Sequence, residues 1–371
     1  MGSSFLMHGL VDCALKEVIF FKSRGRHALK LLIDAVQHQQ LIQYISFSQM
    51  AVGAFSIVEM LFSTNLLAIV GAGEQPSLSP RKLCLFNTLT GSALRELNFL
   101  TSIVAVRLNR KRLLIVVLRD KTYIYDLNSL VILETIDTVP NNKGLCAFSP
   151  GSESCYLALP ASTTKGSVLI YNTVALQSVC QIDAHKSPLV AMIFSSSGTY
   201  LATASQQGTI IRVHLVSQAT ESYSFRRGTY PSTIYSLSFG PCADVPEVLV
   251  ATSSSGSLHA FLLGPAIKQR RKPYRVIGSL IPDTLSDAFD HAYHHILHNV
   301  VPACVKSHVR IYSIDNISSA PGVSGFRASI FIITHNGYFR EYSLNVTKSN
   351  ECSWSLEREV NVLDTISNDP N

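Results

Sequence analysis

Two adjacent arginines, Arg226 and Arg227, are the residues of this sequence whose types and spacing most clearly suggest chemistry. They end a stretch in which aromatic and small polar residues alternate as in a strand, and Pro231 prevents its continuation as a central strand. Because successive side chains of a strand point to opposite faces, the two guanidinium groups should serve two separate sites. Guanidinium suits bidentate phosphate contacts, and no acidic residue lies between Ser222 and Tyr230. Two ordinary surface arginines remain the alternative to two anion sites.

Hydroxyl, imidazole and further guanidinium groups flank the arginine pair and could complete phosphate sites around it. On the N-terminal side they are His185, Ser205, Thr209 and Arg212, with Gly208 between them, and on the C-terminal side Ser253, Ser257 and His259. Each taken alone is better explained as a turn or strand residue than as a ligand. Spacing alone does not decide between two pockets and ordinary strand residues.

Composition limits the class of function. The 371 residues carry a formal net charge of +6, which favours acidic partners, but a nucleic-acid binder would usually show a denser basic face. The 8 cysteines are scattered without a paired spacing and indicate reduced cytosolic thiols. No nucleophile elbow, phosphate-binding loop or cofactor motif occurs, so we expect neither an enzyme nor a cofactor. With no segment long enough to cross a membrane and a poor signal peptide, we expect a cytoplasmic protein.

The chain from about residue 49 to residue 364 reads as all-β, with short apolar runs separated by turns. Similar strand ends recur at intervals of about forty to forty-seven residues, the period of a four-stranded propeller blade. These strand ends are Cys84–Asn87, Tyr123–Asp126, Leu169–Asn172, Arg212–Leu215 and His259–Leu262. The period favours a β-propeller of divergent WD repeats over a pair of β-sandwiches. Six blades are legible, and a seventh would have to involve the N-terminus.

Two segments depart from the repeat. Residues 1–48 have apolar residues at helical spacing and do not resemble a blade, and residues 365–371 form a tail. Residues 264–303 form an insertion, in which we expect an amphipathic helix from Leu285 to Val300. Its histidines, at 291, 294, 295 and 298, would share a helical face, which an exposed polar surface explains better than a metal site.

The motif Phe225-Arg226-Arg227-Gly228, with the blade sequence from Ala202 to Val213 before it, resembles the signature of the PROPPINs, WD-repeat β-propellers of autophagy. The likeness runs from about Val52 to about Asp364 and is greatest to plant autophagy-related 18 proteins. It implies a closed, seven-bladed-type ring and a role in recruiting autophagy machinery. A propeller that acts as a protein-interaction scaffold without lipid binding is the alternative function.

The resemblance also implies ligands and roles for particular residues. The expected lipids are phosphatidylinositol 3-phosphate and the 3,5-bisphosphate, on preautophagosomal, endosomal or vacuolar membranes. The first headgroup site would take His185, Ser205, Gly208, Thr209, Arg212 and Arg226, and the second Arg227, Gly228, Ser253, Ser257 and His259. The insertion would contact the bilayer through Lys268, Arg270, Arg271, Leu285, Phe289 and Ile296. Pro80 and Arg81 would contact autophagy-related protein 2, the lipid-transfer protein.

Overall fold

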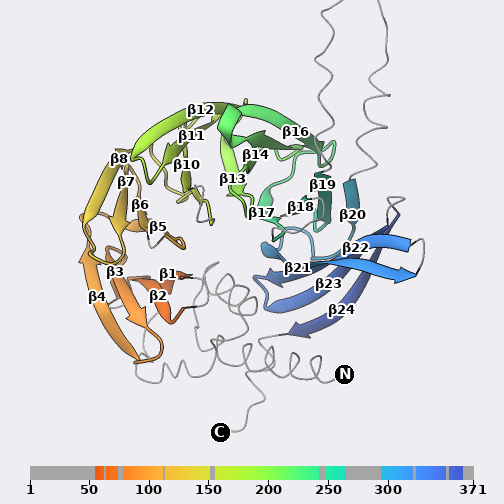
Figure 1. The fold of residues 1–371 in the computed structure, drawn as a ribbon, viewed down its shortest axis with the longest axis horizontal. Helices are drawn as coiled ribbons and strands as arrows, with labels where there is room; N and C mark the ends of the chain where they lie inside the picture. Colours follow the sequence, from red (N-terminus) through yellow and green to blue (C-terminus); the bar gives the residue numbers. More distant parts are fainter. Residues whose placement is uncertain are drawn as a thin grey trace, which may run out of the picture.

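The computed structural model describes residues 55–61, 64–73, 78–111, 113–150, 155–241, 247–263, 294–320, 323–347 and 351–361. Within these ranges the chain forms six antiparallel four-stranded sheets, each connected in chain order, with one short 3₁₀-helix, Val216–Gln218. Figure 1 shows the sheets arranged around a common centre as the blades of a propeller, numbered here I to VI in chain order. The predicted all-β propeller with six legible blades is therefore confirmed.

The blades have these bounds. Blade I is β1 (Phe55–Met60), β2 (Leu66–Gly71), β3 (Lys82–Asn87) and β4 (Ser92–Asn98). Blade II is β5 (Ile103–Leu108), β6 (Leu113–Leu118), β7 (Lys121–Asp126) and β8 (Ile132–Asp137). Blade III is β9 (Ala147–Phe148), β10 (Tyr156–Pro160), β11 (Gly166–Asn172) and β12 (Gln177–His185). The five predicted strand ends lie in the third strands of blades I to V.

The second half of the ring follows the same plan. Blade IV is β13 (Leu189–Phe194), β14 (Tyr200–Ser205), β15 (Ile210–Leu215) and β16 (Thr220–Arg226). Blade V is β17 (Ile234–Phe239), β18 (Glu247–Ser253), β19 (Leu258–Leu263) and β20 (His294–Leu297). Blade VI is β21 (Ser307–Ala320), β22 (Val323–Thr334), β23 (Tyr338–Thr347) and β24 (Cys352–Asn361).

The hydrophobic core lies between the blades. Strand β6, Leu-Leu-Ile-Val-Val-Leu, is buried along its whole length, whereas the outer strand β4 is almost entirely exposed. An inner strand covered on both faces requires a continuous apolar run, which explains these sequences. One cluster, for example, joins Ile211 and Phe225 of blade IV to Leu249 and Phe261 of blade V. Every blade thus depends on its neighbours for burial.

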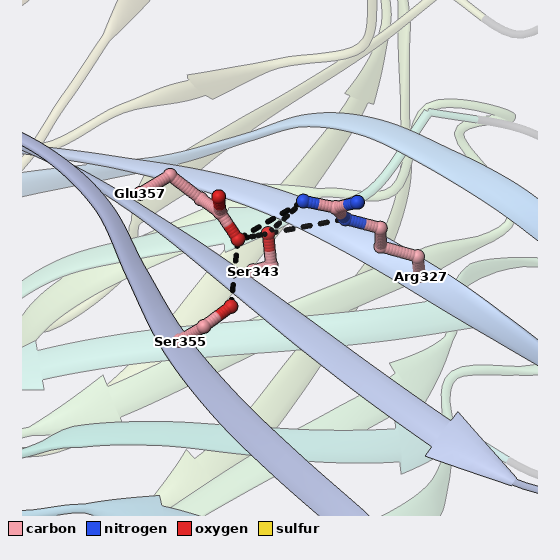
Figure 2. A network of polar contacts seen from close by, with 4 residues as sticks. All are labelled: Arg327, Ser343, Ser355 and Glu357. Carbon is pink, nitrogen blue, oxygen red and sulfur yellow. Dashed lines mark hydrogen bonds and ion pairs between the residues drawn. The ribbon is translucent and has the colours of Figure 1, made fainter.

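Blade VI has longer strands than the others and carries a polar network across three of them. Figure 2 shows Arg327, Ser343, Ser355 and Glu357, which come from β22, β23 and β24. The Ser343 hydroxyl accepts from Arg327 Nη2 at 2.6 Å and donates to Glu357 Oε1 at 2.7 Å. These hydrogen bonds, helped by Arg327, lower the pKa of the Glu357 carboxyl. The network ties β22, β23 and β24 of this blade together.

The structure corrects one expected element. The helix expected from Leu285 to Val300 is wrong for its described part, because His294–Leu297 form β20, the fourth strand of blade V. Without it the backbone groups of β19 would have an unpaired edge, and pairing them outweighs a helical pattern of a few residues. Residues 298–300 form a turn after this strand, whereas residues 285–293 and the expected N-terminal helix lie outside the described residues. No helix among the described residues is long and apolar enough to cross a membrane.

Candidate functional site

Arg226 and Arg227 lie on opposite faces of blade IV. In the ladder between β15 and β16, Ile210 is opposite Arg226 and Arg212 is opposite Ser224, so Arg212 and Arg226 belong to one face. The other face carries Phe225, and Arg227 follows it there. Arg226 is exposed, whereas the exposed fraction of Arg227 is 7%. The strand alternation read from the sequence therefore separates the arginines, but they differ sharply in burial.

The face of Arg226 meets the end of blade III in a first polar cluster. His185 Nε2, at the end of β12, lies 3.0 Å from Thr203 Oγ1 of β14. Arg212 Nη1 donates to the carbonyl oxygen of Ala184, and its Nε lies 3.1 Å from Glu221 Oε2. Arg212 is thus held in place and partly neutralised, so it adds less positive charge to this cluster than the sequence suggested.

Burial, and after it the charge of Arg212, lower the pKa of His185 to about 4. The pKa of His214, on β15, is lowered to about 4 for the same two reasons. Both imidazoles are therefore neutral near pH 7 and act as hydrogen-bonding groups. Thr203 and His214 belong to this cluster although sequence reasoning had not singled them out. Thr203 lies two residues before Ser205 on β14, and His214 lies two residues after Arg212 on β15. This spacing places each pair on one face of its strand and could have identified both residues.

The turn between β14 and β15 supplies Ser205, Gly208 and Thr209. Ser205 is buried, and Gly208 N donates to its carbonyl oxygen at 2.9 Å. Gly208 has φ +61°, and a Cβ there would overlap the carbonyl oxygen of Ser232. Glycine is therefore required at this position both for its backbone conformation and for space. The turn lies at the boundary of the two faces, next to both arginines.

Arg227 is fixed by two backbone carbonyls on the other face. Its Nε donates to Gly208 O at 2.7 Å and its Nη2 to Tyr230 O at 2.6 Å. These bonds orient the guanidinium, and no hydrogen bond of its Nη1 group is seen among the described residues. Burial lowers its pKa, although an arginine still keeps its charge at any physiological pH. A Cβ added at Gly228, beside it, would meet nothing within 4 Å among the described residues, so lack of space does not explain this glycine.

The second cluster lies where this face meets blade V. Ser253 and Ser257 bracket the β18–β19 turn and are buried, and His259 follows on β19 with an exposed fraction of 3%. Gly256, with φ +78°, repeats the role of Gly208 in this turn. The aromatic rings of Phe225 and Phe261 stack at 4.7 Å between ring centroids and join the two blades beneath the cluster.

Two histidines that the sequence had placed on a helix join this cluster instead. His294 Nε2 lies 2.9 Å from His259 Nδ1, and His298 Nδ1 lies 3.2 Å from Ser257 Oγ. Treating His294–Leu297 as the missing fourth strand of blade V would have predicted their position. The described residues contain no group of His, Cys, Asp and Glu side chains arranged to hold a metal ion.

The fold and these motifs can now be compared with known proteins. A model of the PROPPIN family matches residues 24–280. The chain belongs to the PROPPIN family. It is 62% identical over 317 residues to autophagy-related protein 18b of Arabidopsis thaliana, which covers 84% of this chain and 86% of that relative. The match to the family begins inside the N-terminal segment that did not resemble a blade from its sequence pattern.

Solved structures show the same fold at low sequence identity. Hsv2 of Kluyveromyces lactis is similar with a TM-score of 0.62 and 18% identity, over 83% of this chain and 87% of that one. KlAtg21, solved with the coiled coil of AgAtg16, has a TM-score of 0.59 and 23% identity, over 83% and 85% of the two chains. These likenesses support the propeller architecture.

Of the remaining expected site residues of this PROPPIN, Pro80 and Arg81 belong to blade I, and Ile296 is opposite His259 in blade V. Pro80 and Arg81 stand in the connection between β2 and β3 of blade I, where Arg81 is exposed and its carbonyl oxygen accepts from Phe99 N at 2.8 Å. Ile296, expected on a membrane-contacting helix, lies on β20 with an exposed fraction of 38%. The other expected membrane-contacting residues, Lys268, Arg270, Arg271, Leu285 and Phe289, lie outside the described residues.

Proposed function

We propose that this PROPPIN is a non-catalytic receptor for phosphatidylinositol 3-phosphate or the 3,5-bisphosphate, with two headgroup pockets on opposite faces of blade IV. The observation that supports this most is the separation of Arg226 and Arg227 onto opposite faces, each beside its own cluster of hydroxyl and imidazole groups. A phosphomonoester needs a positive charge and several adaptable donors, and each cluster offers both.

The first pocket combines Arg226 with His185, Ser205, Gly208, Thr209 and Arg212. The second combines Arg227 with Gly228, Ser253, Ser257 and His259. Two weak headgroup contacts on one rigid ring act together when both lipids lie in the same membrane. The geometry thus favours binding to a lipid surface over binding to a single soluble phosphate.

Further contacts would tie the bound propeller to the membrane and to its partners. Residues 264–293 connect β19 to β20, the strands that carry the second pocket. Lys268, Arg270 and Arg271 in this connection would attract an anionic leaflet, with about 1 kcal/mol for each charge near the surface. Leu285 and Phe289 would enter the bilayer. The bound protein would then recruit autophagy machinery at preautophagosomal, endosomal or vacuolar membranes.

A protein contact is proposed for blade I. The exposed Arg81, next to Pro80, would bind autophagy-related protein 2. The structure of KlAtg21 with the coiled coil of AgAtg16 is a case in which a propeller of this shape binds a protein. Replacement of Arg81 by glutamate should reduce capture of the purified partner without changing liposome binding. Equal capture by the variant and the wild type would contradict the assignment of this contact.

Liposome co-sedimentation tests the lipid function. Vesicles of phosphatidylcholine with either phosphoinositide should retain the wild type, whereas vesicles of equal charge made with phosphatidylserine should retain far less. Arg226→Ala should lose most of this binding while its melting temperature stays within about 1 °C of the wild type, since an exposed arginine contributes little to folding. Binding that follows vesicle charge alone, or that Arg226→Ala leaves unchanged, would favour a scaffold without lipid specificity.

A further inference from the structure

Three histidines share one face of the outer part of blade V. In the ladder between β19 and β20, Phe261 is opposite His294 and His259 is opposite Ile296. Residues that lie opposite each other in a ladder share a face, so His259, Phe261, His294 and Ile296 point to the same side. His298 follows two residues after Ile296, and its contact with Ser257 keeps it on that side. His295 belongs to the opposite face, which packs toward blade VI.

Stacking and hydrogen bonding hold these rings in place. Phe261 stacks on Phe225 of blade IV and on His294, with ring centroids 4.5 Å apart in the second pair. His259 and His294 are themselves stacked at 5.2 Å, and His259 Nδ1 lies 2.9 Å from His294 Nε2. One of these two nitrogens must donate to the other, so the pair shares a proton when it is neutral. His259 Nε2 is buried and has no hydrogen-bond partner among the described residues.

The charged and titratable groups around the three rings are predominantly cationic. After β16, Arg227 contributes a permanent positive charge, and the β18–β19 turn contributes uncharged hydroxyl groups, among them that of Ser257. Glu247, farther along the same face of β18, is the acidic group of this face, and burial raises its pKa. Burial, followed by His294, Arg227 and His298, lowers the pKa of His259 to about 3. On blade VI, Arg340 donates to the carbonyl oxygen of Val300 and pairs with Glu359 at 2.6 Å, so its charge is locally balanced.

We propose that His294 and His298 are phosphate ligands of the second pocket and that this pocket takes up a proton together with a phosphomonoester. This inference rests on the proposed function, because it describes how one of its two pockets binds. A phosphate dianion bound beside Arg227 places negative charge next to the histidines, which favours their protonated, charged form. A protonated imidazole donates from both ring nitrogens. Uptake of a proton by these histidines therefore adds N–H donors that can bind the phosphate.

Proton uptake can be measured directly by calorimetry. In an Arg226→Ala background, which silences the first pocket, inositol 1,3-bisphosphate is titrated in buffers with different ionisation enthalpies at about pH 6 and about pH 7.5. The background protein should take up protons on binding and bind about five-fold more tightly at the lower pH. Adding His294→Gln and His298→Gln should weaken binding and remove both the proton uptake and the pH dependence. The phosphate itself loses charge near pH 6, and comparing the variants with the same ligand removes that effect.

His295→Gln is the matched control, because His295 is the neighbour of His294 on the opposite face of β20. Its proton uptake should equal that of the background protein. If His294→Gln lowers the melting temperature, the proton uptake of the His298→Gln variant is used alone as the test. His298 is exposed, so this change should not unfold the blade. Equal proton uptake with and without His298 and His294 would overturn the inference.

Additional arms separate this inference from the proposed function. Wild-type protein that fails to bind inositol 1,3-bisphosphate and phosphatidylinositol 3-phosphate vesicles at every pH contradicts the proposed function itself. Binding without histidine-dependent proton uptake contradicts the inference alone. Inorganic phosphate in place of the inositol compound identifies the source of the ligand: binding of comparable strength would show a site for free phosphate, which contradicts a lipid-headgroup pocket.

Discussion

Arg227 Nε donates to the carbonyl oxygen of Gly208 at 2.7 Å, which ties the end of β16 to the turn between the second and third strands of the same blade. Its Nη2 holds the Tyr230 carbonyl oxygen in the same way. The proposed second pocket therefore includes a residue that also organises the backbone on both sides of it. Arg226, one position earlier, is exposed on the other face. The adjacent arginines consequently differ in what they do for the fold.

Arg227→Ala should lower stability as well as lipid binding. The change leaves two carbonyl groups without a charge-assisted hydrogen bond and opens space at a buried position, which should cost on the order of 2–3 kcal/mol. Thermal unfolding should show a lower melting temperature for Arg227→Ala than for Arg226→Ala. The burial of Arg227 and the exposure of Arg226 account for this expected difference.

Arg227→Lys provides a second comparison at this position. Lysine keeps the positive charge but cannot reproduce the planar fork that reaches both carbonyl groups. It should recover part of the lipid binding lost in Arg227→Ala and little of the stability. Identical melting temperatures for wild type, Arg226→Ala and Arg227→Ala would mean that the two carbonyl bonds do not contribute to stability.

Gly208→Ala should be much more damaging than Gly91→Ala. Both glycines have a positive φ, +61° and +63°, so both substitutions meet a similar backbone cost of about 1 kcal/mol. A Cβ at Gly208 would also overlap the Ser232 carbonyl oxygen, whereas a Cβ at Gly91 has nothing within 4 Å among the described residues. Chemical denaturation should therefore show a larger loss of stability for Gly208→Ala, and co-sedimentation a loss of lipid binding that Gly91→Ala lacks. Equal losses would show that the turn adapts to the added methyl group.

The sequence predicted the repeat because the third strands of blades I to V end in similar residues. The segments ending at Asn87, Asp126, Asn172, Leu215 and Leu262 all lie in β3, β7, β11, β15 and β19. Propeller blades repeat one local unit, so the period is visible even without the usual Trp-Asp dipeptide. Strand alternation likewise predicted that Arg226 and Arg227 would face different sides.

Burial and pairing with distant strands were less accessible to sequence reasoning. Alternation gives the side of Arg227, but not that Tyr230 and Gly208 would both turn a carbonyl oxygen toward it. His294–Leu297 fits either a helical or an extended pattern because four residues are about one helical turn. The free edge of β19, some thirty residues earlier in the chain, determined which one formed. The roles of His294 and His298 depend on that pairing and were missed with it.

Stability should fall as the pH is lowered from about 6.5 toward 4. His185, His214 and His259 are buried with pKa values lowered to about 4, about 4 and about 3, mainly by burial. An unfolded chain binds protons at these residues below pH 6.5, while the folded protein does not until much lower pH. The neutral rings therefore contribute fully to the free energy of unfolding above about pH 6.5. At pH 5 each ring has lost on the order of 2 kcal/mol of this contribution.

Melting temperatures between about pH 7.5 and pH 4.5 would check this dependence. His214→Gln removes one of the three titrating groups and should give a shallower decline than the wild type, even if its stability near pH 7.5 is lower. A decline of the same slope in both proteins would show that other groups control acid unfolding.

Replacing residues 264–293 by a short Gly-Ser linker should separate membrane contact from headgroup recognition. The last residue of β19, Leu263, and the first of β20, His294, lie at the same end of one antiparallel ladder, so a short linker can join them. The strands, His259 and His294 remain in the shortened protein. Its melting temperature and its affinity for soluble inositol 1,3-bisphosphate should therefore stay close to those of the wild type.

Binding of the shortened protein to phosphoinositide vesicles should fall by more than tenfold, because Lys268, Arg270 and Arg271 are removed together with Leu285 and Phe289. Three charges near an anionic leaflet contribute about 3 kcal/mol in total, which is more than enough for such a change. Phe289→Asp in the full-length chain should reproduce much of the loss, while Ile296→Asp, on β20, tests the pocket rather than the connection. Full vesicle binding by the shortened protein would mean that the two pockets alone attach the propeller to the membrane.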